Sequence, residues 1–526
     1  MRLVLIVTRK DKQRNELNLI AAQLEAGESQ VLRLTEDYIV NYPDDSDGWI
    51  FRGRALQLNS EFKLMLSAAR RAVEADSESF VAKVFLMEAL ALNGFYLESL
   101  KIAEEVQNEK KYDPSILLAI GNFYLENSFY SQSLQIFERL RILMPSDILA
   151  IHRLATLYTS LGNLQKAEEL YDFIIKKKPS DADAYYSRAI IRSQTISDNH
   201  IDQLNDMLKK SPASDHTFCY ALAKEYEDIK DWEKSFFFLK RGADSHSKLF
   251  PYDGSYDIDT VKNIKGSFSK KWLSEKSRGY DKDSPIFVLG MPRSGTTLID
   301  RVLSSHSQIT SAGESNEFSM SVMRACGTHD GKGNIPFDIA VNLDFYSLGE
   351  DYCRSQKEKL PNSDRFLDKT PFNFFLIGLI KASLPKAKII HVRRNPVASC
   401  YAIYKTLFRN GYNFSYNLEN TADFYASYLN IMNHWRDLDP DIFLDVSYED
   451  FVSDQKNQTN KLLNWCELDW EEEVLEFTKN TSPTLTASAA QVRRPIYKSS
   501  IDQWRNYENQ LQPLINRLAY HGISIN

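Results

Sequence analysis

The sequence has little cysteine, no recognisable metal-ligand spacing and no strong excess of charge of either sign. Five cysteines are scattered over 526 residues, and none of them forms a CxxC pair. A dispersed, odd-numbered set favours free thiols in a reducing compartment over a disulfide framework, and we expect no metal. The formal net charge of −7 argues against a general nucleic-acid-binding protein.

A long hydrophobic run is also missing at the start of the chain. The apolar MRLVLIV is followed at once by the charged TRKDKQRNEL. It is too short for the core of a signal peptide and far too short to span a bilayer, so we expect a cytoplasmic protein without a membrane span. With 526 residues, of which 43% are hydrophobic and 26% charged, the chain has a globular composition and the length for two or more domains.

A period of 34 residues organises the first half of the chain. Pro43, Pro145 and Pro179 are separated by multiples of 34, and YPDDSD, MPSDIL and KPSDAD are alike. Each of these segments is typical of the end of one helix and the start of the next. We frame the units as 12–45, 46–79, 80–113, 114–147, 148–181, 182–215 and 216–249.

Small residues are frequent at the eighth and twentieth positions of these units, for example Gly53, Ala155 and Ala167. The period, the small residues and the terminal proline resemble the tetratricopeptide repeat, although the first, second and sixth units are degenerate. This resemblance implies an all-α solenoid over 12–249 with a concave face. Two roles stay open: the array scaffolds or dimerises the protein, or its groove holds a peptide or an acceptor.

The pattern changes after Ser247. Pro and Gly in LFPYDGSYD mark a boundary, a polar connector covers 250–280, and IFVLG predicts a strand buried on both faces. Gly290 and Gly295 then bracket MPRS, and TTLIDRVLSSH has apolar residues at helical spacing. A strand, a glycine loop and a helix in this order direct backbone N–H groups at an anion. The loop matches G-x-x-x-x-G-K-[ST] except at Thr296, which disfavours hydrolysis of ATP or GTP.

The loop offers other donors to a phosphate. Arg293 supplies a guanidinium fork, and the neighbouring serine and threonines supply hydroxyl groups. The segment GMPRSGTTL resembles the 5′-phosphosulfate loop of sulfotransferases, and RSGTTL resembles that of tyrosylprotein sulfotransferases in particular. The resemblance covers about 284–520, and repeats ahead of such a domain resemble a bacterial family with the same layout.

This resemblance implies a P-loop-like α/β domain over 281–526 with a central parallel sheet. It implies 3′-phosphoadenosine 5′-phosphosulfate (PAPS) as the donor cosubstrate and no metal. The residues that it assigns to the 5′-phosphate are Arg293, Ser294, Gly295, Thr296 and Thr297.

A second anion site is expected in AKIIHVRRNPVASCYAIYK, which contains a second apolar strand. The segment resembles the 3′-phosphate segment of the family, with Arg394 as the matching arginine and Arg393 as its support. The family's serine, eight residues later, is replaced by Ala402. Ser399, one helical turn earlier, is the candidate substitute.

Near the C-terminus, YKSSIDQW resembles the loop that closes over the same phosphate. Lys498 matches as a phosphate cation and Trp504 as a packing residue, whereas Ser499 and Asp502 stand where glycines are usual. The preceding QVRRP adds two arginines, Arg493 and Arg494, that face either phosphate or solvent.

The catalytic residues are also expected from the resemblance. DKTPFN resembles the family's NKDPF, which implies Lys369 as an electrostatic and acid catalyst beside Arg293. Counted without gaps from Arg293, Glu314 falls on the catalytic glutamate of tyrosylprotein sulfotransferases, and a carboxylate is a competent base. The alternatives are that Glu314 caps a helix and that His306 is the base. Asn316 stands where the tyrosylprotein enzymes carry an arginine that reads the acceptor, so tyrosine specificity is not implied.

We therefore predict a PAPS-dependent sulfotransferase that acts on an acceptor hydroxyl of a protein tyrosine, a glycan or a small molecule and releases 3′-phosphoadenosine 5′-phosphate. The alternative is a non-catalytic, repeat-based interaction module with a structural nucleotide-binding domain. A nucleotide kinase or hydrolase is disfavoured by Thr296. The acceptor and the oligomeric state, including a homodimer, are left open.

Overall fold

The computed structural model describes residues 11–26, 30–110, 113–211, 215–275, 279–328, 334–408, 411–484, 492–493, 496 and 499–525. Contacts between residues divide the chain into two compact units. The first consists of Met1–Phe129, Asn316–Asp344 and Glu350–Pro361, and the second of Tyr130–Ser315, Phe345–Gly349 and Asn362–Asn526. The predicted domains 12–249, 250–280 and 281–526 were drawn along the sequence and stay a prediction.

Consecutive helices form the repeat array, as the period predicts. Those of the first unit are α1 (Asp11–Ala26), α2 (Val31–Asn41), α3 (Ser46–Leu58), α4 (Phe62–Ala75), α5 (Phe80–Leu92), α6 (Tyr96–Glu109) and α7 (Pro114–Glu126). Those of the second are α8 (Tyr130–Leu143), α9 (Ile148–Ser160), α10 (Leu164–Lys177), α11 (Ala182–Ile191), α12 (Ile201–Lys210), α13 (Asp215–Asp228) and α14 (Trp232–Leu249).

The 34-residue period is a ladder of helix N-caps. Asp45, Ser79, Asp113, Asp147 and Asp181 each precede a helix. In every case the side-chain oxygen accepts a hydrogen bond from a backbone N–H two or three residues further on. Such a cap satisfies an N–H group that lacks a helical partner, and is worth about 1 kcal/mol. At these five positions the predicted end of a repeat is therefore the N-cap of the next helix, which confirms the repeat.

The small residues allow paired helices to approach closely. A Cβ atom added to Gly53 would lie 2.4 Å from Cζ of Phe85, so this position of α3 admits only glycine without a shift of the ring. Ala155 of α9 and Ala167 of α10 are fully buried. Close packing of such helices fills the core of each pair with aliphatic side chains.

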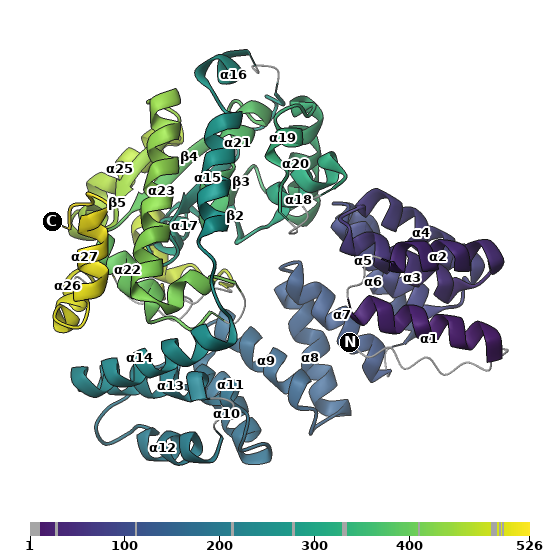
Figure 1. The fold of residues 1–526 in the computed structure, drawn as a ribbon, viewed down its shortest axis with the longest axis horizontal. Helices are drawn as coiled ribbons and strands as arrows, with labels where there is room; N and C mark the ends of the chain where they lie inside the picture. The colour runs from purple at the N-terminus through teal and green to yellow at the C-terminus, as the bar shows by residue number, and fades with distance from the viewer. Residues whose placement is uncertain are drawn as a thin grey trace. The chain divides into compact units, whose positions relative to one another are not determined.

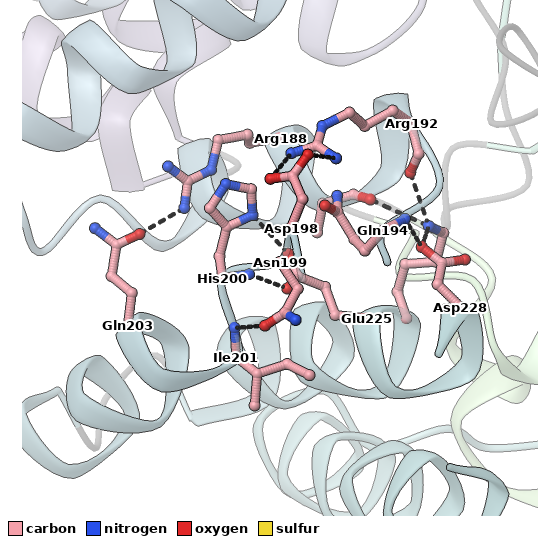
Figure 2. A network of polar contacts seen from close by, with 12 residues as sticks. Arg188, Arg192, Gln194, Asp198, Asn199, His200, Ile201, Gln203, Glu225 and Asp228 are labelled. Carbon is pink, nitrogen blue, oxygen red and sulfur yellow. Dashed lines mark hydrogen bonds and ion pairs between the residues drawn. The ribbon is translucent and has the colours of Figure 1, made fainter. Parts of the chain in front are cut away.

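The sixth repeat, framed as 182–215, departs from the helix-pair pattern, and the structure shows why. Helix α11 ends at Ile191, and the segment up to His200 is held by polar contacts instead of a helical turn, as Figure 2 shows. The Arg192 Nε atom donates to Glu168 Oε1 at 2.8 Å, and the Gln194 N–H donates to Asp228 Oδ2 at 2.8 Å. These contacts fix an irregular loop between α11 and α12, which explains the degenerate sequence.

One cap provides a test of the array's stability. Burial disfavours the carboxylate of Asp181, but hydrogen bonds from His152 and Lys178 outweigh burial and lower its pKa to about 2. At pH values above the pKa of this aspartate in the unfolded chain, near 3.9, its lowered pKa in the folded chain stabilises the fold by about 2 kcal/mol. This stabilisation is lost as the pH falls toward 2.

We therefore expect Asp181→Asn, which keeps a capping oxygen, to lower the melting temperature by about 2–4 °C at pH 7. Asp147→Asn is the matched control because Asp147 caps α9 through Ala150 N–H. Scanning calorimetry between pH 7 and pH 3 measures the difference from wild type. A difference that does not shrink below pH 4 would contradict the charged pair as its cause.

The second unit contains a parallel sheet. Its strands are β1 (Ile286–Gly290), β2 (Ile309–Gly313), β3 (Arg365–Asp368), β4 (Lys388–Arg393) and β5 (Leu444–Ser447). The five strands have the order β2-β3-β1-β4-β5, and every described pairing is parallel. The predicted strand IFVLG and the strand predicted within AKIIHVRRNPVASCYAIYK are the central neighbours β1 and β4. The prediction of an all-α array followed by an α/β domain with a parallel sheet is confirmed.

Helices cover both faces of the sheet (Figure 1). The remaining helices are α15 (Ser255–Ser267), α16 (Lys270–Glu275), α17 (Thr296–Leu303), α18 (Glu317–Cys326), α19 (Phe337–Ala340), α20 (Phe345–Lys359), α21 (Ile377–Ser383), α22 (Pro396–Tyr404), α23 (Leu418–Leu438), α24 (Tyr448–Ser453), α25 (Gln455–Trp465), α26 (Ser499–Asp502) and α27 (Gln512–Tyr520). Short 3-10 turns lie at Pro371–Phe375, Asn413–Tyr416, Glu472–Lys479 and Gln503–Tyr507. On one face Val288 and Ile390 share a core with Val302 of α17 and Leu462 of α25.

The later repeat helices pack directly against the sheet-containing part of the second unit. The Tyr220 hydroxyl of α13 donates to the Tyr404 carbonyl at 3.0 Å, and Leu407 N–H donates to the Tyr186 hydroxyl of α11 at 3.2 Å. His246 of α14 stacks on Tyr416 with ring centroids 3.6 Å apart. Helices α11, α13 and α14 therefore belong to the same compact body as the α/β part.

The first unit also joins repeat helices to a later segment. Glu317 of α18 accepts hydrogen bonds from the Tyr96 hydroxyl of α6 at 2.6 Å and from Arg324 Nη2 at 2.7 Å. Met320 and Met323 pack against the apolar core of α3–α5. Buried charges survive when paired and hydrogen-bonded, and this network provides both for Glu317.

Within the described ranges, no helix has both the length and the apolar character that crossing a bilayer requires. The five cysteines all lie in these ranges and are thiols that form no disulfide with one another, as the sequence predicts. Four of them are buried, and Cys326 is partly exposed.

Candidate functional site

The candidate residues follow the carboxyl ends of the parallel strands. β1 leads into the glycine loop at Gly290, β2 into Glu314, β3 into Lys369, and β4 into Arg394. Ligands of open parallel sheets bind at this edge, because several loops and helix N-termini converge there. All these strand ends belong to the second unit.

The glycine loop needs its unusual residues. Gly290 has φ +144°, and an added Cβ would lie 2.5 Å from the Val392 carbonyl oxygen of the paired strand. Gly295 has φ +108°, and its added Cβ would lie 2.5 Å from Cδ2 of Tyr448. Arg293 adopts a left-handed φ of 65°, which costs a residue with a side chain about 1–2 kcal/mol. Such local strain is typical of a loop shaped around a ligand.

Within the part of the chain that the structure describes, the loop presents a buried hydroxyl without a hydrogen-bond partner. Ser294 is 1% exposed, and its Oγ atom has no hydrogen-bond partner among the described residues. Thr296 and Thr297 are also buried, at the N-terminus of the eight-residue helix α17. A buried hydroxyl without a partner is costly, whereas a bound phosphate oxygen would satisfy it. The donor set fits the 5′-phosphate of a nucleotide.

The two arginines at the end of β4, Arg393 and Arg394, make different contacts. Arg394 Nη1 donates to the Arg293 carbonyl oxygen at 3.1 Å, and its guanidinium lies 4.8 Å from the Tyr448 ring centroid. The Arg393 side chain is 56% exposed, and its Nε atom lies 3.9 Å from Asp445 Oδ1 instead. The geometry therefore joins Arg394, and not Arg393, to the glycine loop.

Ser399 and Ala402 both lie on α22, whose N-cap is Asn395. The Ser399 side chain is 1% exposed, and its Oγ atom has no hydrogen-bond partner among the described residues. A second buried, unsatisfied hydroxyl beside the Arg394 segment fits a second anion, which supports Ser399 as the substitute for the serine that Ala402 replaces.

Glu314 and Lys369 form the closest charged pair at the strand ends. Lys369 Nζ donates to Glu314 Oε1 at 2.5 Å. The Lys369 side chain is only 1% exposed, whereas that of Glu314 is 41% exposed. The carboxylate is therefore open to an incoming hydroxyl, and the ammonium supports it from the interior.

Backbone contacts fix this pair. Lys369 N–H donates to the Gly313 carbonyl at 2.9 Å, and the Thr370 hydroxyl donates to the Ser315 carbonyl at 2.8 Å. The parallel pairing of β2 with β3 thus holds the two motifs GES and DKT side by side. Preorganised charges of this kind are what electrostatic catalysis requires.

Three residues near these groups escaped the sequence prediction. Asp300 of α17 is buried, and burial raises its pKa although the Lys369 ammonium opposes this rise. Tyr448, the residue after β5, packs on Gly295, and Lys405 is the C-cap residue of α22. The available signals were weak: an acid on a phosphate-loop helix, an aromatic residue at a strand end, and a basic residue on the helix after Arg394.

The alternative base, His306, and the described C-terminal candidates make contacts away from the strand ends, and other C-terminal candidates lie outside the described residues. His306 is 2% exposed, and its Nε2 atom donates to the Asp469 carbonyl at 3.1 Å, which indicates a packing role. Arg493 Nη2 donates to the Ser160 carbonyl of α9 at 2.8 Å. Trp504 is 3% exposed, in agreement with a packing residue. Lys498 and Arg494 lie outside the described residues.

A cavity of about 1240 Å³ opens beside Arg394. Arg393, Arg394 and Asn395 line it from the end of β4, and Ser447 and Glu449 line it from the end of β5. The rest of its lining comes mainly from α15, α23 and the segment around α27, and the lining includes no residue of the glycine loop and neither Glu314 nor Lys369, so the cavity adjoins the candidate site at Arg394 without containing it. Among the described residues, no group of three or more His, Cys, Asp or Glu side chains is arranged to hold a metal ion.

Most of the candidate residues lie in a stretch of the chain that matches a family model. The model of the sulfotransferase family matches residues 285–472. An uncharacterised protein of Aquifex aeolicus is 28% identical over 449 residues, which cover 82% of this chain but only 58% of that protein.

Solved structures resemble each part of the chain at low identity. The sulfotransferase domain of the Synechococcus PCC 7002 olefin synthase is 18% identical, with a TM-score of 0.34 over 47% of this chain and 98% of that one. The tetratricopeptide-repeat protein YrrB is 15% identical, with a TM-score of 0.26 over 40% of this chain and 97% of that one. Residues 285–472 thus match the sulfotransferase family, and the helix pairs that precede them repeat with the 34-residue period of the tetratricopeptide repeat.

Proposed function

We propose that this protein transfers a sulfuryl group from PAPS to an acceptor hydroxyl. The observation that carries the proposal is the ion pair between Lys369 Nζ and Glu314 Oε1, which are 2.5 Å apart. The pair lies at neighbouring strand ends within the stretch that matches the sulfotransferase family. The same sheet edge carries the glycine loop with its unsatisfied Ser294 hydroxyl. Base, cation and anion loop thus converge at one edge, as sulfuryl transfer requires.

Two groups of residues would hold the donor. Arg293, Ser294, Gly295, Thr296 and Thr297 would hold the 5′-phosphate, and Arg394, Ser399 and Lys498 would hold the 3′-phosphate. When bound, PAPS supplies a sulfuryl group, whose bond to the 5′-phosphate oxygen breaks as the acceptor oxygen bonds to sulfur. The support is chemical: cations and buried hydroxyl donors lie after β1 and after β4, which are adjacent strands.

Three residues of the chain have separate roles in the proposed transfer. Glu314 takes the proton of the acceptor hydroxyl, and its exposed carboxylate can be reached by that group. Lys369 and Arg293 stabilise negative charge that develops on the transferred group and on the 5′-phosphate. Lys369 is also the proton donor to the phosphate oxygen, since burial keeps it away from competing water.

The side chains near Glu314 bear on the acceptor. Burial raises the pKa of Tyr412 to about 12, and the negative charge of Glu314 contributes to this rise. Tyr412 packs on Phe372 with ring centroids 5.0 Å apart. An aromatic wall beside the base suits a phenolic or other apolar-bodied hydroxyl better than a fully polar glycan. The repeat groove is then available to hold the polypeptide or carrier that presents this hydroxyl.

Transfer of labelled sulfate tests the proposal. The full chain is incubated with ³⁵S-labelled PAPS and a panel of tyrosine peptides, phenols, glycans and aliphatic alcohols. We expect label on at least one hydroxyl compound, with release of 3′-phosphoadenosine 5′-phosphate. Binding of that nucleotide without any transfer across the panel would favour the non-catalytic interaction module.

Ser399 gives a specific prediction for the donor site. We expect Ser399→Ala to weaken 3′-phosphoadenosine 5′-phosphate binding about tenfold, because a hydrogen bond to a charged group is lost. Affinity for adenosine 5′-phosphosulfate, which lacks the 3′-phosphate, should not change. The control is Ser415→Ala, which removes another fully buried serine hydroxyl of the second unit. Equal losses for both nucleotides would contradict a role of Ser399 at the 3′-phosphate.

A further inference from the structure

The helix that carries the phosphate-loop threonines also carries a buried arginine. Helix α17 begins at Thr296, and Arg301 lies in its last turn. The Arg301 residue is 2% exposed. Its guanidinium donates four hydrogen bonds, and all four acceptors belong to the segment 480–484. One segment of the chain, distant in the sequence, therefore contacts the phosphate-loop helix through this side chain.

The four acceptors of Arg301 are uncharged. Nη1 donates to the Asn480 carbonyl oxygen at 3.2 Å and to Asn480 Oδ1 at 3.0 Å. Nη2 donates to the Ser482 carbonyl oxygen and to the Thr484 hydroxyl. Burying a charge that has only uncharged acceptors is costly, and an apolar side chain of similar length would fill the same space without that cost. What the guanidinium adds is direction, because its bonds fix the segment 480–484 against the side of α17.

The same segment also holds the end of α17. Asn480 Nδ2 donates to Ser304 Oγ at 3.1 Å and to Ser305 Oγ at 3.4 Å. Ser304 is the C-cap residue of α17, and the Ser305 hydroxyl donates to the Arg301 carbonyl oxygen at 2.8 Å. The segment 480–484 therefore clamps the helix at its side and at its C-terminal end.

The clamp is bonded in turn to the repeat array. Thr484 N–H donates to the Ser160 carbonyl oxygen at 3.0 Å, and Ser160 is the last residue of repeat helix α9. Arg493 Nη2 donates to the same carbonyl oxygen at 2.8 Å. A Cβ atom added to Gly162, in the turn after α9, would lie 2.7 Å from Arg493 Nε, so the glycine makes room for the guanidinium. All these residues belong to the second unit.

The position of the phosphate loop depends on how α17 is held. Ser294 Oγ has no hydrogen-bond partner among the described residues, so it does not tie the loop to the protein. Ile299 and Val302 pack α17 into the core, but apolar contacts are not directional. An eight-residue helix is too short to be stable alone, so tertiary contacts must hold it. The bonds of Arg301 supply the directional part of this support.

We infer that Arg301 is a positioning residue of the donor site, which holds the phosphate-loop helix in place through the segment 480–484. The inference rests on the proposed function and deepens it, because it names what keeps the 5′-phosphate donors in position before the nucleotide binds. Donors that are ordered in advance cost less affinity than donors that must be ordered on binding. Through Ser160, repeat helix α9 supports the donor site as well.

Calorimetric titration of the full chain with two nucleotides tests this inference. Arg301→Met removes the guanidinium but keeps an unbranched side chain that packs well in a core. We expect Kd to rise about tenfold for 3′-phosphoadenosine 5′-phosphate and by the same factor for adenosine 5′-phosphosulfate, because both place a 5′-phosphate in the loop. Arg301→Lys keeps the charge and part of the hydrogen bonding, so it should recover part of the lost affinity.

Arg365→Met is the matched control for Arg301→Met. Arg365 also donates to backbone carbonyls within the second unit, those of Ser284 and Cys466, but it lies at the start of β3, at the edge of the sheet opposite the phosphate loop. Both variants should lower the melting temperature, and only Arg301→Met should lose nucleotide affinity while circular dichroism shows it to be folded. Wild-type affinity of folded Arg301→Met, or an equal loss of affinity in Arg365→Met, would overturn the inference.

A milder variant keeps the inference testable if Arg301→Met does not fold. Asn480→Ala removes the Oδ1 acceptor of Arg301 and the contacts with the two serines, and it should raise Kd about threefold for both nucleotides. The exposed Asn464→Ala is its control. Unchanged affinity of Asn480→Ala would contradict the clamp. A wild-type chain that binds neither nucleotide would contradict the proposed function instead, so the two failures are distinguishable.

Discussion

Replacing Glu314 by glutamine should lower the rate of sulfuryl transfer by about 10²–10⁴-fold, the range typical of a lost general base. Glutamine keeps the size and a hydrogen-bonding oxygen for Lys369 but cannot take the proton of the acceptor hydroxyl. Donor affinity should change little, because Glu314 follows β2, away from the candidate phosphate residues after β1 and β4. Single-turnover measurement with labelled PAPS gives the rate, and nucleotide titration gives the affinity.

The exposed Glu473→Gln is the matched control for this change. It removes the same charge from the same unit without touching the strand ends. Transfer by Glu314→Gln at the rate of this control would rule out Glu314 as the base. A large loss of nucleotide binding in Glu314→Gln would also contradict the account, since it would place Glu314 at the donor phosphates.

Lys369→Met should have a comparable effect for a different reason. The substitution removes a buried cation from the place where negative charge develops, which typically costs about 10²–10³-fold in rate. Methionine has a similar length and suits a side-chain site that is 1% exposed. The change also leaves Glu314 without the ammonium that lies 2.5 Å from it.

The same single-turnover measurement applies to Lys369→Met, with the exposed Lys386→Met as its control. Because base and cation act on one transfer step, the double variant Glu314→Gln/Lys369→Met should lose much less than the product of the single losses. Fully multiplicative losses would indicate that the two side chains act independently. Unchanged transfer in Lys369→Met would remove the residue from the mechanism.

Local patterns were sufficient for much of the fold. The N-caps Asp45, Ser79 and Asp147 recur with the period that marks the repeat, because capping depends only on neighbouring backbone groups. Gly290 and Gly295 have the positive φ angles that a phosphate loop requires, which no residue with a side chain adopts easily. Such features depend on local geometry and can be predicted from short segments.

The parts that escaped prediction depend on contacts between distant segments. Glu314 and Lys369 were predicted separately, but their pairing follows from β2 lying next to β3, and no local pattern encodes that order. Arg393 and Arg394 also make different contacts, one with Asp445 and the other with the Arg293 carbonyl, because different segments of the fold lie beside the end of β4. The contact of Arg301 with Asn480 spans 179 positions, and nothing near Arg301 in the sequence indicates its partner.

Titration of the full-length chain with 3′-phosphoadenosine 5′-phosphate tests the central claim most directly. A donor site with a glycine loop for one phosphate and the Arg394–Ser399 segment for another predicts micromolar affinity for this nucleotide. It also predicts much weaker binding of ATP, since Thr296 replaces the lysine that holds a triphosphate chain. Equal or tighter binding of ATP, or no binding of the bisphosphate, would contradict a PAPS-dependent sulfotransferase.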